Sequence, residues 1–267
     1  MIHIRRSRYC ATAVALLMGM ACAQAQTPVA VNPLLLKPVE QITADEVRGM
    51  QQRLSDWPNL ARYREANARV PAKQAGTPRV LFYGDSITQL WGEKDPAQFF
   101  PGKGYLNRGI SGQTTPQMLL RFRQDVIALQ PDVVLILAGT NDIAGNTGPS
   151  TQAMIEDNLH AMVELARAHG IRVVLASVLP VSDYRWMPGI DPAPKVRALD
   201  AALKQYAAAQ GLVYLDYYTT MANAAGGLDP ALAADGVHPT AKGYALMSPL
   251  AEQAIAQALK TTPPGAH

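Results

Sequence analysis

The chain has 267 residues, of which 48% are hydrophobic and 17% are charged. These values are typical of a soluble globular protein with one sizeable core, and they do not require a second large domain. The formal net charge is +3, but Arg5, Arg6 and Arg8 lie in a leader without acidic residues. Without that leader the chain is nearly neutral, so we expect no nucleic-acid partner and no attraction to anionic lipid.

Residues 1–25 have the pattern of a secretory signal peptide. An apolar stretch, 11–20, follows the three arginines, and the Ala-Gln-Ala sequence at 23–25 predicts cleavage before Gln26. A membrane anchor is one alternative, but the stretch is well short of the ~20 residues that span a bilayer. A lipoprotein acylated at Cys22 is another, although the leucine usual three residues earlier is missing. We expect export to the periplasm or the extracellular medium, and no membrane span.

Both cysteines of the chain, Cys10 and Cys22, fall in this leader. Cleavage after Ala25 would leave no disulfide, no thiol nucleophile and no cysteine metal ligand. The stability of the mature chain must then come from burial of its core.

The next stretch, 26–77, predicts an N-terminal strap and a helical flank that is too small to be a domain. Residues 29–37 are punctuated by proline, which favours an irregular strap. A capping-box pattern at 43–46 predicts the start of a first helix, 56–58 should break it, and 59–68 predicts a second helix. We expect the flank to pack on the domain that follows, and the first helix has an apolar face made by Val47, Met50 and Leu54.

The remainder of the chain, 78–260, alternates between predicted strands and helices, and the tail 261–267 is expected to be disordered. The predicted strands are 79–83, 105–108, 133–138, 172–178 and 213–217. The predicted helices are 115–129, 150–169, 195–209 and 241–260. This alternation predicts an α/β fold with a five-stranded parallel sheet and helices on both faces, a three-layer α/β/α flavodoxin-like arrangement.

Residues suited to catalysis follow several of these strands. Ser86 comes after the first strand, Gly112 after the second and Asn141 after the third, while Asp235 and His238 lie between the fifth strand and the last helix. In an open parallel sheet, ligands bind beyond the carboxyl ends of the strands. We therefore expect these residues to meet at one edge of the sheet.

A serine hydroxyl becomes a useful nucleophile only when a base takes its proton. Of the histidines, His238 is the one in a loop at the expected edge; the others are at the chain ends or on the predicted helix 150–169, namely His3, His267, His160 and His169. Asp235, three residues before His238, could accept the imidazole Nδ1–H and leave Nε2 free for Ser86. Alternatively, Asp235 only caps an Asp-Gly turn, and the two interpretations are compatible.

At this point the chain resembles the SGNH hydrolases, also called the GDSL esterases and lipases. The resemblance rests on four ordered blocks: Gly84-Asp85-Ser86-Ile87, Asn107-Arg108-Gly109-Ile110-Ser111-Gly112, Gly139-Thr140-Asn141-Asp142 and Asp235-Gly236-Val237-His238. Ile87 replaces the usual leucine, a change that conserves volume. The resemblance implies that Ser86 is the nucleophile, His238 the general base and Asp235 its partner. It also implies an oxyanion hole made by the N–H groups of Ser86 and Gly112 and the side-chain amide of Asn141.

These implied roles are chemically reasonable. Glycine at 112 allows a backbone amide to approach a ligand closely, and Asn141 offers an uncharged donor to a transient oxyanion. The alternatives are a tight turn at Gly112 and a turn-forming asparagine at 141, with Asp142 bracing that loop. The sequence has no Gly-x-Ser-x-Gly elbow and no His-Glu-x-x-His or carboxylate cluster, so we expect no α/β-hydrolase cap, no metal and no cofactor.

The sequence indicates less about the substrate than about the reaction. The blocks at 89–91 and 107–109 are most similar to the branch that includes platelet-activating-factor acetylhydrolase catalytic subunits, which implies short acyl groups. The loop 184–188 is aromatic and could wall a substrate cleft, stack on a sugar ring or simply pack on the surface; Trp91 leaves the same alternatives. The sequence does not indicate an oligomeric state.

Taken together, the sequence predicts an exported serine esterase for short-chain acyl esters, with acetyl favoured and a small molecule or carbohydrate as the alcohol. A lysophospholipase or thioesterase with the same residues is an alternative. A non-catalytic carbohydrate-binding protein on the same scaffold is another, but it would not need a complete catalytic set.

Overall fold

The computed structural model describes residues 36–265. The predicted signal peptide, 1–25, with Cys10 and Cys22, lies outside the described residues. A five-stranded, all-parallel sheet forms the centre in the order β2-β1-β3-β4-β5. The strands are β1 (Val80–Gly84), β2 (Leu106–Gly109), β3 (Val133–Leu137), β4 (Arg172–Ala176) and β5 (Val213–Leu215). This confirms the predicted flavodoxin-like α/β fold, whose strand order reverses beside β1.

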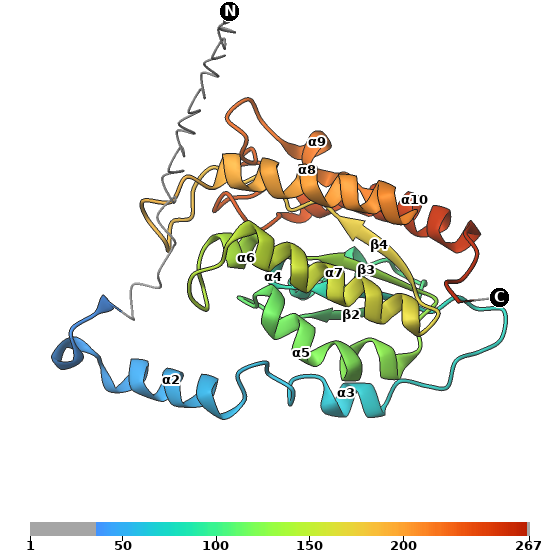
Figure 1. Ribbon diagram of the computed structural model, residues 1–267, viewed down its shortest axis with the longest axis horizontal. Coiled ribbons are helices and arrows are strands. Elements are labelled where there is room, and N and C mark those ends of the chain that lie inside the picture. Colours follow the sequence, from blue (N-terminus) through green and yellow to red (C-terminus); the bar gives the residue numbers. More distant parts are fainter. Residues whose placement is uncertain (1–35, 266–267) are drawn as a thin grey trace, which may run out of the picture.

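The central strands are short runs of apolar residues because helices cover both faces of the sheet (Figure 1). Every residue of β1 and β3 is buried. One face packs on α5 (Thr115–Asp125), α7 (Gln152–Ala168) and α8 (Pro192–Gln210). The other face packs chiefly on α10 (Ala241–Lys260), with α9 (Tyr217–Met221) beside it.

The predicted helix 115–129 is shorter than expected. Regular α-helix ends at Asp125, because Val126 has φ −124° and ψ −66°, and the chain continues as the 3₁₀ turn η3 (Ile127–Leu129). Gln130 then adopts a left-handed conformation, with φ 51°. The apolar periodicity continues across this irregular turn because Ile127 and Leu129 are still buried in the core.

The other long helices deviate less. α8 begins at Pro192, before the predicted start at 195, because proline is well suited to the first turn of a helix. Near the sheet edges, the short helices α4 (Ser86–Gln89) and α6 (Thr140–Ile143) and the 3₁₀ turn η2 (Pro96–Gln98) were not predicted. They are too short for a hydrophobic period to be visible in the sequence.

The N-terminal flank differs most from expectation. After the 3₁₀ turn η1 (Val39–Gln41), helix α2 (Ala44–Ser55) begins at the predicted capping box of Thr43 and Glu46. α2 contains no buried residue, and Leu54 is 82% exposed, so its apolar face does not pack on the sheet domain as expected. Figure 1 shows α2 standing away from the sheet and its covering helices.

The second predicted helix, 59–68, is largely wrong. Only α3 (Arg64–Ala68) is helical, because the carboxylate of Asp56 accepts the N–H groups of Leu60 and Ala61 and holds a turn there. Asn59 has φ 57°, which also interrupts a helix. This segment contacts the sheet domain through the packing of α3 against α5.

Within residues 36–265, no helix is both long and apolar enough to span a bilayer. Beyond α10, Thr261 accepts a hydrogen bond at its carbonyl from Arg172 Nε at 2.9 Å.

Candidate active site

Ser86 is the first residue of α4, immediately after β1. Its neighbour Asp85 caps that short helix by accepting the N–H of Ile87 at 2.9 Å. The turn is tight: a Cβ on Gly84 would lie 2.1 Å from Thr88 Oγ1, and a Cβ on Gly109 would lie 2.2 Å from Gln89 N. Glycine at both positions therefore allows β1, β2 and α4 to pack closely, and this fixes the position of the serine.

His238 and Asp235 approach Ser86 from the loop before α10. Ser86 Oγ lies 2.8 Å from His238 Nε2, and His238 Nδ1 lies 2.6 Å from Asp235 Oδ2. Asp235 Oδ1 also accepts the backbone N–H groups of Val237 at 2.9 Å and His238 at 2.8 Å. Asp235 thus contacts both the turn and the imidazole, so the contacts expected under each of the two interpretations are present.

The environment of Asp235 keeps its carboxylate ionised. Partial burial would raise its pKa, but hydrogen bonds from the His238 side chain and from the N–H groups of His238 and Val237 outweigh burial and lower the pKa below its ordinary value. A persistent carboxylate at this position favours the His238 tautomer with a proton on Nδ1, and that tautomer offers an unprotonated Nε2 to Ser86.

The backbone N–H groups of Ser86 and Gly112 are available as donors. Gly112 has φ 76°, a conformation that glycine adopts readily. In the described part of the chain, neither N–H donates a hydrogen bond to another protein atom. Both residues line the same cavity.

Asn141 lies in α6, after β3, and its side chain is held in one orientation. Its Oδ1 accepts from Asn146 Nδ2 at 2.7 Å, while its Nδ2 donates to Gln113 O at 3.0 Å and to Asp85 Oδ2 at 3.3 Å. Both Asn141 donors are therefore engaged by the protein, and the contact with Asp85 is the longer one. Asn146, which sequence reasoning missed, sets this orientation.

The residues predicted for the site line one cavity of about 420 Å³, apart from Asp235, which lies behind His238. The lining comprises Ser86, Leu90, Ser111, Gly112, Asn141, Asn146, Trp186, Val237 and His238. Trp186, 40% exposed, donates from Nε1 to Asn146 Oδ1 at 3.1 Å. Trp91, by contrast, is 2% exposed and belongs to the core.

The aromatic loop 184–188 combines two of the three roles left open by the sequence, because part of it packs on the protein and part of it lines the cavity. Tyr184 is fully buried, and its hydroxyl lies 2.8 Å from Thr140 Oγ1, whereas Trp186 faces the cavity. The buried tyrosine anchors the loop on α6, so Trp186 is a fixed wall of the cavity.

Two buried carboxyl groups support the loops behind the site. Burial raises the pKa of Asp85 to about 6 and that of Asp142 to about 7. Asp142 accepts hydrogen bonds from the N–H and the hydroxyl of Thr115, which join the loop after β3 to the start of α5. The predicted bracing role of Asp142 agrees with these contacts.

The raised pKa of Asp142 predicts a pH dependence of stability. Between its unfolded pKa of about 4 and its folded pKa of about 7, the folded state binds more protons than the unfolded state, so this contribution to stability is lost as pH rises. The free energy of unfolding, measured with urea at about pH 5 and about pH 8, should fall more between these two pH values in the wild type than in Asp142→Asn. The expected difference is about 1 kcal/mol or more. The exposed Asp157→Asn on α7 is the control. Equal slopes for wild type and Asp142→Asn would contradict this prediction.

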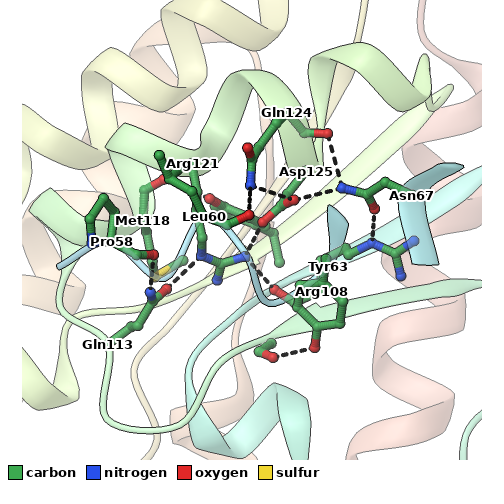
Figure 2. Close-up of polar contacts among 12 residues, drawn as sticks. Pro58, Leu60, Tyr63, Asn67, Arg108, Gln113, Met118, Arg121, Gln124 and Asp125 are labelled. Atoms are coloured by element: carbon green, nitrogen blue, oxygen red, sulfur yellow. Dashed lines mark hydrogen bonds and ion pairs between the residues drawn. The ribbon is translucent and has the colours of Figure 1, made fainter. Parts of the chain in front are cut away.

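A buried arginine, missed in the sequence, connects the loops around the site (Figure 2). Arg121 on α5 has no exposed surface, and its guanidinium lies 4.2 Å from the ring centroid of Tyr83. It donates to Gln113 Oε1 at 2.5 Å, to the carbonyls of Arg108 at 2.9 Å and Gly84 at 3.0 Å, and to Asp125 at 3.1 Å. Arg121 therefore binds the ends of β1 and β2 and the residue after Gly112.

The N-terminal segment extends this network. Gln113 Nε2 donates to Pro58 O at 2.7 Å, and Gln124 Nε2 donates to Leu60 O at 2.7 Å. Asn67 donates to Asp125 Oδ1 at 2.7 Å and accepts from Arg108 Nε at 2.7 Å. Figure 2 shows this segment lying against Arg121 and the residues that Arg121 contacts. The segment 58–67 is thus attached by polar contacts more than by an apolar face.

Replacing Arg121 with methionine should destabilise the fold. The change leaves Asp125 buried without its cation and two backbone carbonyls without this donor, so we expect the free energy of unfolding to fall by about 3–5 kcal/mol. Arg123→Met, an exposed arginine on the same helix, should leave it nearly unchanged. Chemical denaturation of both variants checks this, and equal stability of the two would contradict it.

No group of His, Cys, Asp or Glu within the described residues could hold a metal ion. The site offers instead a hydroxyl, an imidazole, a carboxylate and inward-facing amides. This set is suited to nucleophilic acyl transfer.

A model of the GDSL-like Lipase/Acylhydrolase family matches residues 82–246. A candidate acylhydrolase from Bacteroides fragilis NCTC 9343 is 45% identical, with a TM-score of 0.74, over 77% of this chain and 99% of that one. A candidate platelet activating factor from Streptococcus pneumonia is 25% identical, with a TM-score of 0.65, over 79% and 98% of the two chains.

Curated relatives are more distant. Esterase TesA of Pseudomonas aeruginosa is 28% identical over 62% of this chain and 82% of its own length. An uncharacterized lipoprotein of Bacillus subtilis is 41% identical, but the match covers only 28% of this chain and 32% of that protein.

Proposed function

The chain belongs to the GDSL-like Lipase/Acylhydrolase family of carboxylic ester hydrolases, and we propose on this basis that it cleaves short-chain acyl esters through an acyl-serine at Ser86. The observation that carries the assignment is the continuous path from Ser86 Oγ to His238 Nε2 at 2.8 Å and from His238 Nδ1 to Asp235 Oδ2 at 2.6 Å. In this proposal Ser86 is the nucleophile, His238 the general base and Asp235 the residue that orients it.

In the first step, His238 Nε2 takes the hydroxyl proton as Ser86 Oγ attacks the ester carbonyl. The carbonyl π electrons move onto oxygen, which gives a tetrahedral oxyanion. Collapse of this intermediate breaks the bond to the alcohol oxygen, and the alcohol leaves with the proton from His238. Water then loses a proton to His238, attacks the acyl-serine and releases the acid, and Ser86 recovers its proton.

The oxyanion would be held by the N–H groups of Ser86 and Gly112 and by Asn141 Nδ2. The two backbone donors support this assignment because they are unpaired within residues 36–265 and share the cavity with the nucleophile. Asn141 Nδ2 would exchange its long hydrogen bond to Asp85, 3.3 Å, for one to the substrate oxygen. It would keep its hydrogen bond to Gln113 O. Asn146, through its bond to Asn141 Oδ1, would keep the amide nitrogen on that side.

The substrate class rests on the shape of the cavity. At about 420 Å³ it lies near the lower end of small-molecule sites, which are roughly 300–1,000 Å³. Trp186 and Leu90 stand beside the nucleophile and bound the space for an acyl group. This supports acetyl and other short acyl groups, as in the platelet-activating-factor acetylhydrolase branch, over the longer chains of a lysophospholipase or thioesterase. A non-catalytic binding protein would not require the aligned serine and histidine.

The acyl preference can be tested with p-nitrophenyl esters of increasing chain length. An extended apolar groove would gain about 0.8 kcal/mol for each methylene that it buries. We expect kcat/KM to be highest for acetate or butyrate and to fall by octanoate, because in this proposal Trp186, which lines the cavity, limits the length of the acyl group. Trp186→Ala should move the optimum to longer chains.

Two results would count against this substrate class. Rates that rise steadily to decanoate or dodecanoate in the wild type would favour the lipase-like alternative. An unchanged profile in Trp186→Ala would show that this side chain does not limit acyl length. A conservative control is Trp186→Phe, which keeps most of the wall.

The setting of the enzyme is also a proposal. The charged start, apolar stretch and Ala-Gln-Ala site of residues 1–25 support cleavage and export, and the partial similarity to a lipoprotein keeps acylation at Cys22 as the alternative. In this organisation 26–77 is a flank and 78–260 is the hydrolase domain, with a short tail, 261–267. Mass spectrometry of the exported protein would distinguish Gln26 from a lipidated Cys22 as the first residue.

A further inference from the structure

A second cavity, of about 510 Å³, adjoins the catalytic cavity. Ser111, Gly112 and Asn146 line both, so the two spaces meet at the loop that carries a proposed oxyanion donor. The opposite wall comes from the end of α2 and the turn after it. Because this wall lies before residue 82, where the family match begins, it is supplied by the N-terminal flank of this chain.

The lining of the second cavity is mostly polar. Gln52, Arg53 and Asn59 face it, and in the described part of the chain their side chains take part in no hydrogen bond or ion pair. Asp56 also lines it, but its two oxygens already accept the N–H groups of Leu60 at 2.8 Å and Ala61 at 2.9 Å. The cavity therefore offers amide groups and one guanidinium to a ligand, with the nearby carboxylate already occupied.

The wall also includes an aromatic ring. Trp57 lines the cavity and is 37% exposed. Its position is fixed because Gln117 Nε2 donates to Trp57 O at 2.7 Å, and Gln113 Nε2 donates to Pro58 O at 2.7 Å. The turn after α2 is thus attached to the segment that follows Gly112, and its distance from the catalytic residues is set.

We propose that this second cavity is the leaving-group subsite and that it takes the sugar of a carbohydrate ester. The inference rests on the proposed esterase function and specifies its substrate. Sugar hydroxyls can exchange hydrogen bonds with Gln52, Arg53 and Asn59, and the C–H face of a sugar ring can pack on Trp57. An apolar alcohol would bury these polar groups without partners, which is unfavourable. When the acyl–oxygen bond breaks, the alcohol takes its proton from His238 and departs along this cavity.

The test compares two kinds of acetate ester. Ethyl acetate has an alcohol too small to reach the second cavity, whereas a panel of mono-acetylated methyl hexosides and pentosides fills it. In the double variant Gln52→Ala/Arg53→Ala, kcat/KM for the best sugar ester should fall about tenfold, mainly through KM, while that for ethyl acetate stays unchanged. Both side chains are exposed, so the fold should be retained. Trp57→Phe should keep most of the sugar activity and Trp57→Ala should lose it.

The matched control is Arg48→Ala. Arg48 is an exposed arginine on the same helix that pairs with Asp45 and does not line the cavity. An equal loss in Arg48→Ala would assign the effect to surface charge and overturn the proposal. So would an equal loss on both kinds of ester, no loss on either, or a wild type that favours none of the sugar esters over ethyl acetate. In these cases Ser86-dependent hydrolysis of ethyl acetate would leave the esterase function standing; a wild type that cleaves no ester would overturn both.

Discussion

Replacing Ser86 with alanine should lower kcat for any ester substrate by at least about a thousandfold, because the acyl-serine can no longer form. The hydroxyl removed by Ser86→Ala contacts His238 Nε2 and carries little of the packing in the turn, which depends on Gly84 and Gly109. We therefore expect the thermal midpoint to stay within a few degrees of the wild type.

This prediction is checked by steady-state kinetics on p-nitrophenyl acetate, with near-UV circular dichroism to confirm the fold. Ser111→Ala is a useful comparison, because Ser111 lines the same cavity but has no contact with His238. Activity in Ser86→Ala close to that of Ser111→Ala, with an intact fold, would rule out Ser86 as the nucleophile.

Replacing Asp235 with asparagine should lower kcat by roughly a thousandfold to ten-thousandfold, with a modest change in KM. The neutral amide cannot stabilise the imidazolium that forms on His238 during the reaction. It can also donate to Nδ1, which would favour the wrong tautomer. The ionised state of Asp235, maintained by its hydrogen bonds from Val237 and His238, is therefore part of the expected catalytic effect.

The matched control is Asp229→Asn, an exposed aspartate in the same long connection between β5 and α10. It should behave like the wild type. If Asp235→Asn also retained wild-type kcat, Asp235 would be only the cap of the turn, and His238 would require another orienting group.

The parallel sheet, and the meeting of the candidate residues at one edge of it, could be predicted from the sequence because both follow from local patterns in chain order. Unbroken apolar runs such as 133–138 indicated strands covered on both faces, and the strand–helix alternation indicated parallel pairing. Ser86, Gly112 and Asn141 follow successive strands, so their meeting at one edge followed from the topology alone.

The remaining features depend on tertiary contacts. Nothing in the local sequence distinguishes Arg121 from an ordinary helix-surface arginine such as Arg123, yet Arg121 is fully buried and binds the ends of β1 and β2 and the side chain of Gln113. Asn146 sets the orientation of Asn141 through a contact between side chains five positions apart. The exposure of the apolar face of α2 could not be predicted either. A periodic apolar face indicates a helix, but it does not indicate what covers that face.

Labelling with a fluorophosphonate tests the central claim most directly, because this reagent reacts with a serine that a neighbouring base has activated. Intact-protein mass spectrometry should show one adduct per chain, and peptide mapping should place it on Ser86. The adduct should be lost in Ser86→Ala and formed far more slowly in Asp235→Asn. An active wild-type enzyme that forms no adduct, or forms it on another residue, would contradict the account.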